Sequence, residues 1–115
     1  MDPMKRERLQ EAGVDVDEAL ERFMQNEALL MRFLGRLPAD PTFGQLCAAM
    51  EAGDAQAAFT AAHTLKGLAG NLSLHRLHQA VSRQVELLRS GDAAAAAELM
   101  PEIRAAWQAA ADAVT

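Results

Sequence analysis

Residues 54–72, DAQAAFTAAHTLKGLAGNL, decide the fold of this chain because they predict one long amphipathic helix. Gly53 favours the end of the preceding segment, and the carboxylate of Asp54 is of the kind that caps a helix N-terminus. The apolar residues that follow recur at helical spacing along one side: Ala58, Ala61, Ala62, Leu65, Leu68, Ala69 and Leu72. We therefore expect a helix from Asp54 to about Leu72, with that side in a core.

The same helical period continues before and after this segment, interrupted by start and stop signals rather than by linkers. A short helix is predicted over residues 4–12, and a second one carries Leu20, Phe23 and Met24. The last helix contains Pro101, which should kink or split it because proline lacks the backbone donor. Residues that can cap an N-terminus stand before the later helices: Asp15 or Asp17, Asn26, Asp40, Asp54, Ser73 and Asp92.

Strand signals are missing throughout, and the connections between the predicted helices are short. These features predict an all-α fold, an antiparallel four-helix bundle with additional N- and C-terminal helical segments. The chain, residues 1–115, is long enough for a single domain. We expect the core bundle over about residues 15–90 and a C-terminal helical segment over about 92–114. Residues 1–13 are either a helix covering one end of the bundle or a loose leader.

Composition excludes several classes of partner. The net charge is −5, whereas binding to a phosphate backbone requires clustered Lys and Arg. No apolar run approaches the roughly 18 to 20 residues that span a bilayer, and the N-terminus lacks the apolar segment of a signal peptide. The single cysteine, Cys47, is interpreted as a core thiol in a reducing compartment. We expect a cytoplasmic protein that binds neither nucleic acid nor membrane.

His63 lies on the side of its helix opposite the apolar residues, because each residue advances about 100° around the axis. Two glycines follow it on that side, and each costs about 1 kcal/mol relative to alanine. Clearance for the surface of another protein would explain why this cost is tolerated. The neighbours of His63 on the helix surface are mostly polar or small: Gln56, Phe59, Thr60, Lys66, Gly67 and Gly70.

Lys66 stands three residues after His63, so its ammonium group reaches the region around the imidazole. A cation there favours the neutral, nucleophilic ring and would stabilise a phosphoryl group attached to it. The alternative interpretation is an ordinary surface histidine beside an ordinary surface lysine, and the two glycines weigh against it. Phe59 is expected at the edge of the core, with an apolar docking patch beside His63 as the alternative.

Residues 62–72, AHTLKGLAGNL, closely resemble the signature of histidine-containing phosphotransfer (HPt) domains, small four-helix bundles that carry a phosphoryl group on one exposed histidine. The resemblance implies a role in a multistep two-component His–Asp phosphorelay. His63 would become phosphohistidine by taking the phosphoryl group from an aspartyl phosphate on a response-regulator receiver domain, such as that of a hybrid sensor kinase. It would then pass the group to the aspartate of another receiver.

The same resemblance implies roles for the residues around His63. Lys66 would give electrostatic support, and Gly67 would admit the receiver. The other residues expected to contact the partner are Gln56, Phe59, Thr60, Thr64 and Gly70. The Mg²⁺ used in transfer would be held by the receiver, so no cofactor and no metal site are expected in this chain. Because the surface around His63 must admit a receiver, we expect a monomer.

Two observations qualify the resemblance. Ser73 stands where many members have glycine, so the turn after the helix differs from that of the family. No glycine-rich nucleotide box occurs, and autonomous ATP-dependent kinase activity is therefore not expected. The alternative function is a non-catalytic adaptor that binds receivers. A further alternative is a metal site at His75 and His78, which are i and i+3 on one helix, although two histidines without a nearby carboxylate or thiolate pair are a weak ligand set.

Overall fold

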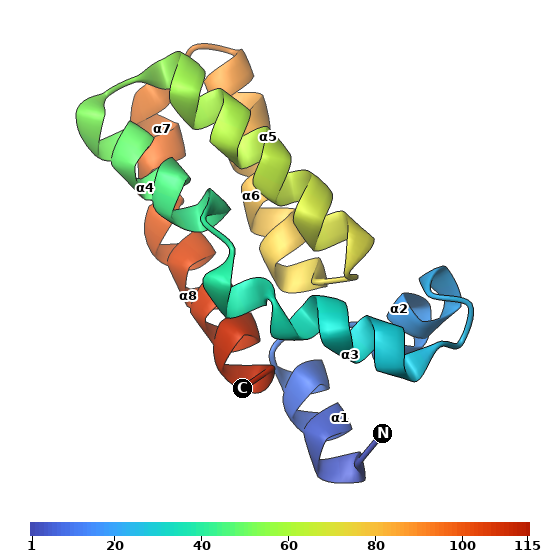
Figure 1. Cartoon of the computed structure of the whole chain (residues 1–115). Coiled ribbons are helices and arrows are strands. Elements are labelled where there is room, and N and C mark those ends of the chain that lie inside the picture. The colour runs from blue at the N-terminus through green and yellow to red at the C-terminus, as the bar shows by residue number, and fades with distance from the viewer.

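Four helices lie side by side and form a bundle in which consecutive helices run antiparallel (Figure 1). In chain order they are α4 (Thr42–Ala52), α5 (Ala55–Asn71), α6 (His75–Arg89) and α8 (Met100–Ala113). The computed structural model describes residues 1–115, and the chain contains no strand. The predicted all-α fold is therefore confirmed. No helix has the length and apolar character required to cross a membrane.

Three shorter helices stand at one end of the bundle (Figure 1): α1 (Pro3–Glu11), α2 (Val16–Arg22) and α3 (Glu27–Gly35), before a short 3-10 turn at Leu37–Ala39. Helix α1 packs against α8 and its Leu9 is fully buried, so residues 1–13 include a docked helix rather than a loose leader. Met24 was predicted to lie in a helix, which was wrong. It follows the end of α2, has a φ of 53° and is exposed.

Most of the predicted caps are present. A side-chain oxygen accepts a hydrogen bond at 3.0 to 3.1 Å from the backbone N–H three residues later at each of Asp15, Asn26, Asp54 and Asp92. Asp40 accepts one from the N–H two residues later, at 2.8 Å, at the start of α4. Pro101 lies in the first turn of α8 and separates it from α7 (Ala93–Glu98), so the last helix is split as predicted. These local signals account for most of the helix boundaries.

Ser73 does not cap α6, so that prediction was wrong. Its φ of 56° is left-handed, a conformation that glycine adopts more easily at the end of a helix. Its hydroxyl donates to Glu18 at 2.9 Å and accepts a bond from Arg22 at 3.2 Å, so the side chain is bonded to α2 and makes no capping bond to α6. The bond from Ser73 is the main reason why the pKa of Glu18 lies below its ordinary value. The two bonds offset the cost of a left-handed serine, about 1–2 kcal/mol.

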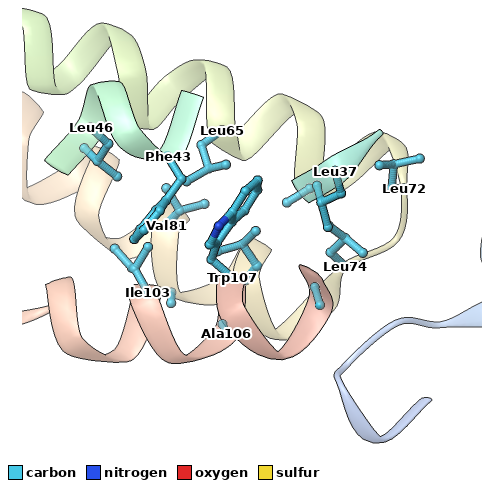
Figure 2. Packing of buried hydrophobic residues seen from close by; sticks show 14 of the residues in the cluster. Leu37, Phe43, Leu46, Leu65, Leu72, Leu74, Val81, Ile103, Ala106 and Trp107 are labelled. Atoms are coloured by element: carbon cyan, nitrogen blue, oxygen red, sulfur yellow. The ribbon is translucent and has the colours of Figure 1, made fainter. Parts of the chain in front are cut away.

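The core includes Phe43 of α4 and Trp107 of α8, whose rings stack with their centroids 5.4 Å apart (Figure 2). Ile103, also in α8, is fully buried in the same cluster. The core therefore continues beyond residues 15–90 and includes the C-terminal helix. Cys47, which was expected in the core, is only half-buried at its edge.

Candidate functional site

Helix α5 presents His63 to solvent because the apolar residues around it face the bundle. Ala62 and Leu65 are fully buried, whereas His63 is exposed. Leu68 differs from the expectation for the apolar side, because it is only partly buried and borders a groove beside α2 and α3. His63 thus points away from the core, as the helical period predicts.

A shallow depression surrounds the imidazole, and its lining contains neither a carboxylate nor an apolar side chain. Helix α2 supplies the first lining residue, α5 the next five and α6 the last: Arg22, His63, Lys66, Gly67, Gly70, Asn71 and His78. Lys66 takes part in no salt bridge, while Arg22 pairs with Glu18 at 3.2 Å. The depression therefore offers positive charge and hydrogen-bond donors to an anion beside His63.

Gly67 and Gly70 of α5 leave this surface open, and neither is needed to avoid a clash inside the protein. A Cβ built at Gly67 would meet no atom within 4 Å. A Cβ at Gly70 would lie 3.5 Å from Cδ2 of His78, which is ordinary van der Waals contact. Neither glycine is required by the packing of this chain alone. The space at Gly67 is therefore available to a molecule that approaches the imidazole.

Phe59 borders His63 on the N-terminal side. The two rings are nearly parallel, at 5°, with centroids 6.1 Å apart, and the guanidinium of Arg89 lies 5.5 Å from the centre of the Phe59 ring. Phe59 is half-buried and packs against the core, so it limits the movement of the imidazole on that side.

The polar residues expected to contact a partner are accessible. Gln56, Thr60 and Thr64 are all exposed on α5. The hydroxyl of Thr64 donates to the backbone carbonyl of Thr60 at 3.0 Å, so its proton is already engaged within the helix. Gln56 and Thr60 do not line the depression, and they extend the exposed surface beyond Phe59 along α5.

His78 enters the depression from α6, beside Gly70. Burial lowers the pKa of His78, and the positive charge of Lys66 lowers it further, with smaller contributions from His75 and Arg22. The imidazole of His78 therefore favours its neutral form. Its ring nitrogens add hydrogen-bonding groups to the depression without adding a further permanent charge.

Sequence reasoning did not assign Arg22, Asn71 or His78 to this site. Asn71 is eight residues after His63, which places it within about 80° of that residue on a helix, so the helical period could have identified it. Arg22 lies in a different helix, and no spacing signal connects it to His63. His78 was considered only as a metal ligand.

An apolar groove adjoins the depression and shares Arg22 and Asn71 with it. Its apolar lining comes from α3, the 3-10 turn, α5 and the residues directly after α2 and α5: Phe33, Leu37, Leu68, Phe23 and Leu72. Phe33 is 40% exposed and Phe23 packs against it with ring centroids 5.5 Å apart. The surface next to the charged depression is therefore suited to contact apolar side chains of a partner.

His75 lies outside the depression, in an environment that the sequence did not reveal. The expectation that no carboxylate pair stands near the two histidines was wrong for His75. Its Nε2 is 3.2 Å from Oε2 of Glu18 and 3.5 Å from Oδ2 of Asp15. The two carboxylates come from the start of α2, almost sixty residues earlier in the chain, so only the tertiary fold brings them to His75.

Comparison with known protein families identifies the family to which this chain belongs. The family model described as Hpt domain matches residues 6–113. Comparisons with curated proteins and with solved structures gave no match. The matched region includes every helix of the bundle and all the residues that line the depression around His63. Because the match covers nearly the whole chain, this protein belongs to the Hpt domain family, whose members act in histidine phosphotransfer within phosphorelays.

Proposed function

We propose that His63 accepts a phosphoryl group from the aspartyl phosphate of one receiver domain and transfers it to the aspartate of another. The observation that carries this proposal is an exposed imidazole beside an unpaired lysine, with open space at Gly67 for an approaching protein. Membership of the Hpt domain family supports the same class of reaction.

The chemistry requires one nucleophile and no nucleotide. A lone pair on a ring nitrogen of neutral His63 forms the N–P bond while the P–O bond to the donor aspartate breaks, which releases that aspartate as a carboxylate. The second transfer reverses these changes with the acceptor aspartate as nucleophile. Lys66 and Arg22 stabilise the negative charge that spreads over the phosphoryl oxygens during each transfer.

The partner in this proposal supplies an acidic pocket. The depression presents Arg22 and Lys66 and no carboxylate, so it complements an acidic surface and is a poor site for Mg²⁺. The Mg²⁺ used in transfer belongs to the receiver in this scheme. The adjoining apolar groove, which includes Phe33 and Leu68, would be covered by the same receiver. We propose that the protein works as a cytoplasmic monomer, since this surface must be free for successive receivers.

A transfer experiment tests the proposal. The full chain is mixed with receiver domains from its own genome, each phosphorylated with a radiolabelled phosphoryl donor. We expect label to move to the wild-type chain and to be absent from His63→Gln, which keeps a polar residue of moderate size at an exposed position. Equal labelling of both proteins would exclude His63 as the acceptor. Stable complex formation without any labelling would favour the alternative function, a non-catalytic receiver-binding adaptor.

A further inference from the structure

We propose that Asp15, Glu18 and His75 form a site for one divalent transition-metal ion, with Zn²⁺ as the ion that fits best. Nε2 of His75 lies 3.2 Å from Oε2 of Glu18 and 3.5 Å from Oδ2 of Asp15, and all three atoms lie within 4.8 Å of one another. Tetrahedral Zn²⁺ with bonds of about 2.0–2.1 Å places its ligand atoms about 3.3 Å apart. The two distances from His75 match an edge of such a coordination shell, and the two carboxylate oxygens are no more than 4.8 Å apart.

The backbone holds two of the three ligands in register. The segment before α2 and the turn before α6 form an isolated antiparallel bridge between Val14 and Leu74. The N–H of Asp15 donates to the carbonyl of Ser73, and the N–H of His75 donates to the carbonyl of Gly13, both at 2.9 Å. These main-chain hydrogen bonds fix the positions of the Asp15 and His75 backbones relative to each other. The two ligands are therefore held more firmly than side chains on two unconnected surface segments.

Gly13 makes this close approach possible. Its φ is 94°, and a Cβ at that position would lie only 2.6 Å from Cβ of Arg76. Any other residue would force the two segments apart, and with them the ligands that they carry.

The carboxylates are oriented by bonds that leave one oxygen of each available. Oδ1 of Asp15 accepts the capping bond from the N–H of Glu18 at 3.1 Å. Oε1 of Glu18 accepts bonds from Ser73 at 2.9 Å and from Arg22 at 3.2 Å. The other oxygens, Oδ2 and Oε2, are those that face His75. Contacts of this kind behind the ligand atoms fix the ligand geometry at metal centres.

The donor set and its exposure select the ion. An imidazole with two carboxylates suits Zn²⁺ and similar transition metals, whereas Mg²⁺ and Ca²⁺ prefer oxygen alone. The side chains of Asp15, Glu18 and His75 are 44%, 35% and 45% exposed, so an ion can enter and water can complete its coordination. A bound ion would join the start of α2 to the start of α6, about one turn from the depression that contains His78.

Calorimetric titration with ZnCl₂ tests this site on the full chain, freed of metal by a chelator and carrying no histidine tag. We expect one Zn²⁺ per chain and a rise in melting temperature when the ion is present. His75→Gln should weaken binding by about tenfold or more. His78→Gln is the matched control, one helical turn away on α6, and should bind as the wild type does. Repeating the titration with Cys47→Ser removes the thiol as a competing ligand.

Asp15→Asn gives a second variant that retains the fold, since asparagine caps a helix as well as aspartate does. It should also lose Zn²⁺ affinity. The proposal is overturned by the absence of a saturable site, by unchanged binding in His75→Gln, or by displacement of Zn²⁺ with equimolar Mg²⁺. Zn²⁺ binding is read without a receiver or a phosphoryl donor, so its failure would leave the proposed phosphotransfer untouched.

Discussion

Replacing Gly67 with glutamine should raise the stability of the bundle while it impairs phosphotransfer. A Cβ at this position meets no atom within 4 Å, so the new side chain extends into solvent. Glutamine is a better helix former than glycine by about 0.5 kcal/mol, and α5 gains roughly that amount. For a chain of this size the melting temperature should rise by about 2 °C.

The effect on transfer has the opposite sign. A receiver that brings its aspartyl phosphate to His63 must occupy the space that the glutamine side chain fills. Steric overpacking costs about 1–3 kcal/mol when a well-fitted contact is crowded. Since each 1.4 kcal/mol is a factor of ten, transfer should slow by roughly 5- to 150-fold. Single-turnover transfer of label from a phosphorylated receiver measures this rate directly.

Gly44→Gln provides the matched control. Gly44 lies in α4, is exposed, has no atom within 4 Å of a built Cβ and does not line the depression. We expect a similar gain in stability and an unchanged transfer rate. Wild-type transfer by Gly67→Gln would refute the argument that clearance at this position serves the partner. A loss of stability would instead show that Gly67 has an internal packing role.

Two further variants test the charges in the depression. Lys66→Ala should slow transfer about tenfold at low ionic strength, and the difference from wild type should shrink in 0.5 M salt because the charge is solvent-accessible; a constant ratio across salt concentrations would contradict electrostatic support. The pKa of His78 is lowered in the folded state, so below about pH 6.5 the unfolded chain binds more protons than the folded chain. The free energy of unfolding therefore decreases as the pH falls below that value. The free energy of unfolding of His78→Gln, measured in urea at pH 7.5 and 5.5, should therefore fall less than that of the wild type, and equal losses would exclude this role of His78.

The helix that carries His63 could be predicted almost completely from the sequence, because its signals are local. Asp54 caps it, the apolar period fixes its buried side, and the observed helix, Ala55–Asn71, agrees with the expected range. The orientation of His63 follows from the same period. Local capping and periodicity therefore determine both the element and the outward direction of its central imidazole.

The features that could not be predicted depend on residues far apart in the chain. The left-handed conformation of Ser73 is accompanied by hydrogen bonds from its hydroxyl to Glu18 and from Arg22, and these partners lie more than fifty residues earlier. The same tertiary contact brings Arg22 towards His63 and two carboxylates towards His75. A pattern read along one helix contains no information about such neighbours.

The stacked pair in the core also provides an intrinsic fluorescence probe, Trp107. Trp107 is the only tryptophan and the chain has no tyrosine, so emission excited at long ultraviolet wavelengths comes from one buried indole against Phe43. Trp107 is not among the residues that line the depression around His63. Its fluorescence should follow unfolding of the bundle and stay nearly constant when a receiver docks, so one unmodified sample can distinguish a damaged fold from a blocked encounter.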